Sequence, residues 1–173
     1  MHSRVFCMVT KLDQGLIERA LDIYEDDIVN WISGADYASE RNDLHKIQDD
    51  VDWLIEWIGI EKKNEEDDDL IEPQIASYDD EDYYYWPIPV EKLKQKLEEE
   101  IKKRIENIKK LLESPVPSLH DIAYKAYNQK GFYFWIDGEE FVNEIDLYEF
   151  FLNSKHNKDL TTLYVVGSFD YHF

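Results

Sequence analysis

Residues 4–10 have the sequence RVFCMVT, a near-continuous run of apolar and β-branched side chains. The run is too short for a buried helix, so it predicts a strand that is buried on both faces of a sheet. Such a strand needs a neighbour on each edge, and the comparable run TTLYVVGSFDYH lies at the far end of the chain, at residues 161–172. We therefore expect residues 1–173 to fold as a single domain.

Between these runs, apolar residues recur at intervals of three and four, which is typical of amphipathic helices. Asp13 and Ser118 are suitable N-caps for two of these helices, and Gly34 is a suitable stop. The pair Asp137-Gly138 predicts a tight β-hairpin turn between residues 132–136 and 140–142. The helices are predicted at residues 13–33, 39–58, 90–113, 118–128 and 145–153.

Periodicity is lost over residues 61–82, where acidic residues and Pro73 predominate, so this segment is predicted to be an acidic, partly mobile loop. The aromatic cluster at residues 83–86 follows it, as an extended segment that either completes the core or serves in recognition. The order of elements predicts an α+β fold. We expect a mostly antiparallel sheet of about four strands, with helices packed on one face.

The chain is strongly acidic, with 39 Asp and Glu against 19 Lys and Arg and a net charge of −20. Residues 61–90 carry 11 acids and 2 bases, whereas residues 91–114 carry 6 acids and 8 bases. A field of this sign repels nucleic acids and anionic membranes, so we expect no direct binding to either. It attracts basic protein surfaces. The alternative is that the charge only keeps the protein soluble.

Two groups of acids are candidates for binding a basic partner. Carboxylates spaced along a helix and a loop imitate the phosphates of DNA, and could occupy the basic groove of a nucleic-acid-handling protein. The hypothesis is therefore a non-enzymatic acidic binding protein, with DNA mimicry as its sharpest version. The candidate residues are Asp49, Asp50, Asp52 and Glu56 on the helix and Asp79, Asp80, Glu81 and Asp82 in the loop.

A second candidate site lies at the two terminal strands, which carry His2, Arg4, Asp170 and His172. If these strands pair antiparallel, the even positions of both share a face and the four side chains converge. Two histidines and an aspartate could bind a divalent metal, and Arg with His could hold an anion. The alternative function is thus a small metal- or anion-binding protein or enzyme, unless these residues are simply solvated.

No motif for a nucleophile elbow, a phosphate loop, a zinc protease or a dinucleotide fold is present, so we expect no cofactor and favour binding over catalysis. Cys7 is the only cysteine, and we expect it to be buried and unreactive. No secretory signal or membrane-length apolar run occurs, which predicts a cytoplasmic location. The oligomeric state stays open, with helix 90–113 as a candidate for pairing with its own copy.

Three short stretches carry a resemblance to known proteins: MHSRVF at residues 1–6, ADY at 35–37 and SFDYHF at 168–173. In these stretches the chain resembles a group of small, uncharacterised acidic proteins of phages and mobile elements of Gram-positive gut bacteria. The resemblance covers the two ends and little between them. It implies that the ends are constrained, and it implies an accessory or counter-defence role.

Overall fold

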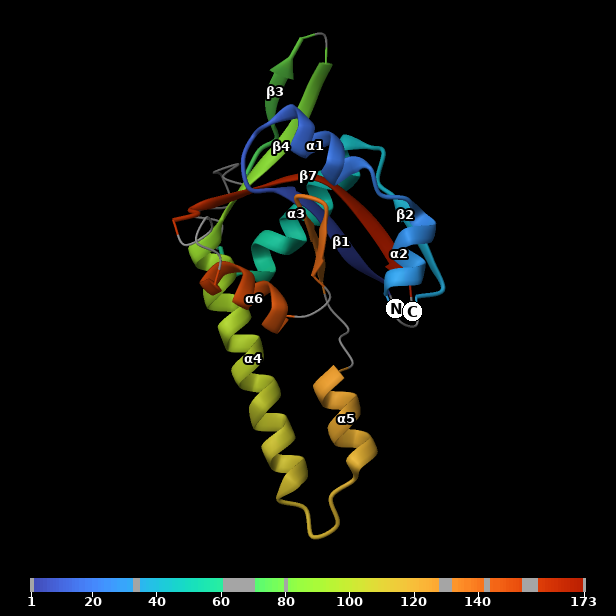
Figure 1. Ribbon diagram of the computed structural model, residues 1–173, viewed down its shortest axis with the longest axis vertical. Coiled ribbons are helices and arrows are strands. Elements are labelled where there is room, and N and C mark those ends of the chain that lie inside the picture. The colour runs from blue at the N-terminus through green and yellow to red at the C-terminus, as the bar shows by residue number, and fades with distance from the viewer. Residues whose placement is uncertain are drawn as a thin grey trace.

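The computed structural model describes residues 2–32, 35–60, 71–79, 81–127, 132–141, 144–153 and 159–172. These residues form an α+β fold (Figure 1), which confirms the predicted class. The strands are β1 His2–Val9, β2 Tyr37–Glu40, β3 Gln74–Tyr78, β4 Glu81–Pro89, β5 Tyr133–Ile136, β6 Glu139–Phe141 and β7 Thr162–His172. The helices are α1 Gln14–Leu21, α2 Glu25–Trp31, α3 Leu44–Trp57, α4 Val90–Leu112, α5 Leu119–Tyr127 and α6 Glu144–Asn153.

In the described residues the sheet has seven strands, six of them in the order β3-β4-β7-β1-β5-β6, and the seventh, β2, pairs with β7. It is mixed, because β1 pairs parallel with β5 while the other pairs are antiparallel. The expectation of a mostly antiparallel sheet is therefore confirmed, whereas the expected number of about four strands is too small. The predicted central position of residues 4–10 is confirmed, since β1 lies between β5 and β7.

β7 is long enough to pair with two strands along one of its edges. Along its other edge it pairs with all of β1, from His2↔His172 to Val9↔Tyr164. The register shifts between Cys7 and Met8, next to Gly167, as at a β-bulge. On the opposite edge, β4 pairs with residues 162–165 and β2 with residues 169–172. β7 thus joins elements from both halves of the chain.

Helices cover both faces of the sheet, so the expectation of helices on one face is wrong. Val5, Cys7 and Val9 of β1 pack in one core with α1 and α2. Phe6 and Met8 point the other way, into a second core with α3, α4 and α6. The reason is already present in RVFCMVT: a strand with apolar side chains on both faces needs cover on both.

Three predicted boundaries also need correction. The helix predicted over 13–33 is broken after Leu21, and α2 starts at Glu25. Residues 37–40 form β2, so α3 begins later than predicted, at Leu44, with Asp43 as its N-cap. Part of the predicted loop at 61–82 is the hairpin β3–β4, whereas residues 61–70 lie outside the described residues, as does Gly34.

α4 and α5 form a hairpin that projects from the sheet (Figure 1). The Ser118 cap predicted for α5 is present, because its hydroxyl accepts from the backbone N–H of Asp121 at 3.2 Å. Arg104 of α4 binds Glu144 of α6 through a hydrogen bond of 2.8 Å and fixes the base of the hairpin. Within the residues that the structure describes, none of the helices has the length and apolar character needed to cross a membrane.

Candidate functional site

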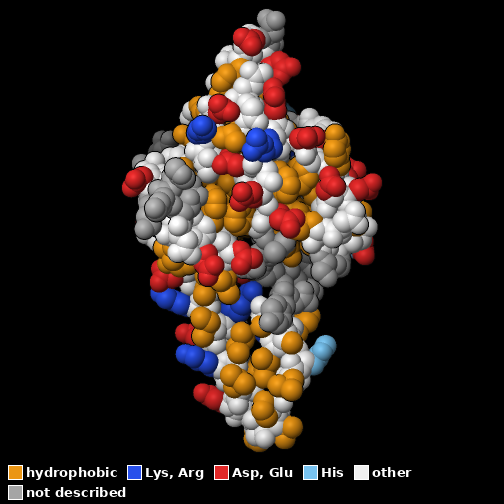
Figure 2. Space-filling view, viewed as in Figure 1, with side chains coloured by type: hydrophobic (Ala, Val, Ile, Leu, Met, Phe, Trp, Pro, Cys, Tyr) orange, Lys and Arg blue, Asp and Glu red, His pale blue; other side chains and the backbone are white. Residues whose placement is uncertain are grey.

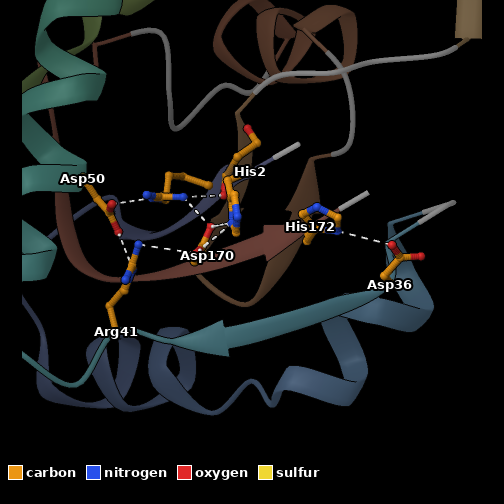
Figure 3. Close-up of polar contacts among 8 residues, drawn as sticks. His2, Asp36, Arg41, Asp50, Asp170 and His172 are labelled. Carbon is orange, nitrogen blue, oxygen red and sulfur yellow. Dashed lines mark hydrogen bonds and ion pairs between the residues drawn. The ribbon is translucent and has the colours of Figure 1, made fainter.

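The four predicted residues of the terminal strands lie together (Figure 3). β1 and β7 pair antiparallel, and the register places His2 opposite His172 and Arg4 opposite Asp170. The even positions of both strands therefore share a face, as the alternation of side chains along a strand requires. His2 Nδ1 lies 3.2 Å from both carboxylate oxygens of Asp170.

Arg4 belongs to a larger network that the sequence alone did not indicate. Its Nε donates to Asp50 of α3 and its Nη1 donates to Asp170. Arg41, just after β2, adds a second guanidinium, with Nε 3.3 Å from a carboxylate oxygen of Asp50 and Nη2 3.5 Å from one of Asp170. Ser168 donates its hydroxyl to Asp50 at 2.8 Å. The network therefore ties β1, β2, α3 and β7 to one another.

This network is balanced in charge and largely shielded from water. It holds two guanidinium groups and two carboxylates, and the side chains of Asp50 and Asp170 are only 3% and 15% exposed. Arg4 also stacks over the Trp53 ring at 5.2 Å. Because each guanidinium is already matched by carboxylates, the network offers an added anion little unpaired positive charge. Its geometry is that of a structural clamp.

The histidines stand at the edge of this clamp. His172 Nδ1 lies 3.2 Å from Asp36, and its ring stacks on Tyr37 with centroids 5.4 Å apart. The rings of His2 and His172 are 5.0 Å apart in an edge-to-face contact. Among the described residues, however, no group of three or more His, Cys, Asp and Glu is placed to hold a metal ion.

Asp50 is misassigned by the sequence prediction, which placed it in an exposed acidic row. It is 2% exposed, because it lies one turn before Leu54 on the face of α3 that packs on the sheet. Asp49 and Glu56 are exposed as predicted, and Asp52 accepts a hydrogen bond from Gln48 at 2.8 Å. The row is thus shorter than expected.

The second predicted group of acids lies on the hairpin β3–β4. Asp79, Glu81 and Asp82 are exposed there, and Asp80 lies outside the described residues. The hydroxyl of Tyr83 donates to Glu81, and this hydrogen bond raises the pKa of Tyr83 to about 12. The two predicted groups of acids thus lie on two different elements, α3 and the hairpin β3–β4.

A different acidic surface lies over α1 and α2, which cover one face of the sheet (Figure 1). Two adjoining hollows of about 630 and 650 Å³ lie there, and Asp22 lines both. We call them together the acidic groove. Its carboxylates are Glu18, Asp22, Asp27 and Glu140, its aromatic side chains are Tyr83, Trp31 and Trp135, and Arg19 is a base that lines the first hollow.

The second hollow has two indole rings in its wall. Trp31 of α2 and Trp135 of β5 meet edge to face, with centroids 5.9 Å apart and an interplanar angle of 66°. Asp22, Asp27 and Glu140 line the same hollow. Sequence analysis missed this site, because Trp31 and Trp135 are far apart in the chain and only the packing of α2 against β5 brings them together.

Cys7 lies on the core face of β1 and is fully buried. Burial raises the pKa of its thiol above the usual value, so little thiolate forms and the residue is no candidate nucleophile. This agrees with the expectation of a small buried side chain.

Taken together, the network of Arg4, Arg41, Asp50 and Asp170 joins four elements, and the acidic groove is a candidate ligand surface within the part of the chain that the structure describes. Comparison of the chain with protein-family models, with curated proteins and with solved structures found no match.

Proposed function

We propose that this chain is a non-enzymatic binding protein whose acidic groove receives a basic segment of a protein partner. The observation that carries the proposal is the second hollow, which is lined by three carboxylates and two indole rings: Asp22, Asp27, Glu140, Trp31 and Trp135. Carboxylates and aromatic rings together are the chemistry that recognises a guanidinium or ammonium group.

Each part of the groove has a physical role in this binding. The carboxylates raise the rate of encounter with a basic partner over a molecule whose net charge is −20. The indole rings supply the apolar contact and the cation–π attraction, worth about 0.5–2 kcal/mol for each ring and cation. An inserted arginine or lysine side chain would use both.

The partner class that we propose is a nucleic-acid-handling protein, because such proteins carry basic surfaces that bind phosphates. Occupying that surface with carboxylates would compete with DNA, which is the action of a DNA mimic. A counter-defence or accessory role in a mobile element, implied by the resemblance of the two ends, is part of the same proposal.

Pull-down from the source cell at low and high salt tests the proposal. The groove variant Asp22→Asn, Asp27→Asn, Glu140→Gln should lose a basic partner that the parent retains at low salt. The control Asp49→Asn, Asp52→Asn, Glu56→Gln removes the same charge from α3, on the other face of the sheet. Equal loss with both variants would mean that only net charge matters, and would overturn the groove as the site.

DNA competition tests the class of the partner. A partner retained by the groove should be released by duplex DNA at a concentration that leaves the fold of this protein unchanged. A basic partner that duplex DNA does not displace would contradict DNA mimicry and leave protein binding by the groove intact.

A further inference from the structure

The apolar stripe of α4 continues beyond the part of the helix that the protein buries. Leu93 and Leu97 are fully buried at the base of the helix. Farther along the same stripe, Ile105 is 46% exposed and Leu112 is 55% exposed. Apolar side chains on turns that stay exposed to water are not buried, so an apolar stripe there does not stabilise the helix.

α5 packs along α4 and covers only part of this apolar surface, and it adds exposed apolar side chains of its own. Leu119 at its first turn is 79% exposed, and Val116 in the preceding connection is 83% exposed. Figure 2 shows hydrophobic side chains gathered over the lower part of the molecule, where Figure 1 places the α4–α5 hairpin. Contiguous apolar surface of this kind marks an interaction site. We call it the hairpin patch, made by Ile105, Leu112, Val116, Leu119 and Tyr124.

We propose that the hairpin patch binds the hairpin patch of a second copy of this chain, in an antiparallel arrangement. A hairpin of two helices is half of a four-helix bundle, and two identical hairpins complete one around a shared apolar core. A twofold contact needs only a surface that matches itself, and an apolar patch meets that condition.

The distribution of charge favours a second copy of this chain as the occupant of the hairpin patch, and it favours an antiparallel arrangement of the two hairpins. Residues 90–127 carry nine bases and seven acids, whereas the rest of the chain carries ten bases and 32 acids. The exposed lysines Lys103, Lys109 and Lys110 lie on the free part of α4. In an antiparallel pair they approach the acidic body of the partner copy, and the two acidic bodies stay at opposite ends. A parallel pair would bring the two acidic bodies together.

Sedimentation of the full chain over a range of concentrations tests the association. We expect a monomer–dimer equilibrium, and at least tenfold weaker association in the variant Leu112→Gln, Leu119→Gln. The control Ile75→Gln, Leu152→Gln changes two apolar side chains elsewhere that are 54% and 44% exposed, and should dimerise like the parent. These positions are exposed, so the variants should retain the parent's circular dichroism spectrum. A monomer at every concentration, or a dimer that the hairpin variant does not weaken, would overturn the proposal.

A short thiol-reactive crosslinker tests the direction. The buried Cys7 should not react, so single cysteines can be placed at Lys102→Cys and Lys110→Cys. If the pair is antiparallel, a mixture of the two variants should form crosslinks mainly between a chain with Lys102→Cys and a chain with Lys110→Cys. Crosslinking of each variant mainly with itself would indicate a parallel pair and overturn the antiparallel arrangement. The dimer does not depend on the acidic groove, so each proposal can fail without the other.

Discussion

Asp49 and Asp50 are neighbours in the chain but lie in opposite environments. Asp49 is exposed, whereas Asp50 is buried, accepts hydrogen bonds from Arg4 and Ser168 and forms an ion pair with Arg41. Replacing Asp50 with Asn leaves two guanidinium groups with too little negative charge in a shielded place. We expect Asp50→Asn to lower the free energy of unfolding by about 3–5 kcal/mol, measured by urea denaturation.

Asp49→Asn is the matched control for this change. It removes the same charge from the same helix, and we expect its effect to stay within about 0.5 kcal/mol. Similar losses for the two variants would show that the clamp contributes no more than the general charge of α3.

The indole N–H groups of Trp31 and Trp86 differ in whether they have a hydrogen-bond acceptor. Trp86 is fully buried and donates to Gln48 at 2.6 Å. The buried N–H of Trp31 has no acceptor among the described residues. Trp86→Phe should cost about 2–3 kcal/mol, because it leaves the Gln48 oxygen without a donor and opens a cavity.

Trp31→Phe removes a donor that contributes no hydrogen bond, so it should change the stability by less than about 1 kcal/mol. Thermal unfolding of the two variants compares them directly. A larger loss in Trp31→Phe than in Trp86→Phe would mean that an acceptor outside the described residues holds the Trp31 indole.

The turn between β5 and β6 is the clearest case where local sequence determines an element. Asp137 and Gly138 both have positive φ, at 53° and 87°, as a tight hairpin turn requires. Asp137 also accepts from the backbone and hydroxyl of Thr10, at 2.9 and 2.6 Å, and thereby joins the turn to the end of β1. Gly138→Ala should cost about 1–2 kcal/mol, because alanine is strained at this φ.

Gly59→Ala is the control, since φ there is 77° and a methyl group would meet nothing within 4 Å. At Gly138 the methyl would lie 2.6 Å from Cδ of Arg19, whose exposed side chain can move away. We therefore expect similar losses of unfolding free energy for the two variants. A much larger loss for Gly138→Ala would show that Arg19 is held in place.

Strong local signals explain which elements the sequence predicted. The stripe of α4, the Asp137-Gly138 turn and the double-sided strand RVFCMVT each determine an element by their own pattern. β2 escaped prediction because its four residues, YASE, have no such pattern and become a strand only by pairing with β7. β3 escaped for the same reason, since it forms by pairing with β4. The break between α1 and α2 escaped because apolar residues keep helical spacing across it, at Leu21, Tyr24 and Ile28.

The residues of the candidate sites also differ in whether the sequence could predict their positions. His2, Arg4, Asp170 and His172 could be placed together because strand alternation and one pairing suffice to join them. The burial of Asp50 and the meeting of Trp31 with Trp135 depend on how helices pack on the sheet, which no single stretch of sequence determines.

The charge of the whole molecule affects its stability as well as its partners. With a net charge of −20, repulsion between surface carboxylates opposes the compact state. Salt screens this repulsion, with a Debye length of about 10 Å at 0.1 M. We expect the melting temperature at neutral pH to rise with added sodium chloride, measured by differential scanning calorimetry.

The rise should be much smaller near pH 4.5, where the sequence places the isoelectric point. The buried clamp of Arg4, Arg41, Asp50 and Asp170 should respond little to salt, because it is shielded from water. A melting temperature that falls with salt at neutral pH would mean that attractive ion pairs outweigh the repulsion.

The pairing of β1 with β7 also has a consequence for how the protein is made. His2 and Asp170 are 168 positions apart, and β5, the other neighbour of β1, also belongs to the second half of the chain. While the ribosome translates the intervening residues, the apolar strand RVFCMVT has neither of its sheet partners. Contacts of such long sequence separation slow folding, and unpaired apolar strands aggregate. The newly made chain therefore depends on late folding, after β7 has been synthesised, and its high acidity helps to keep it apart from its copies until then.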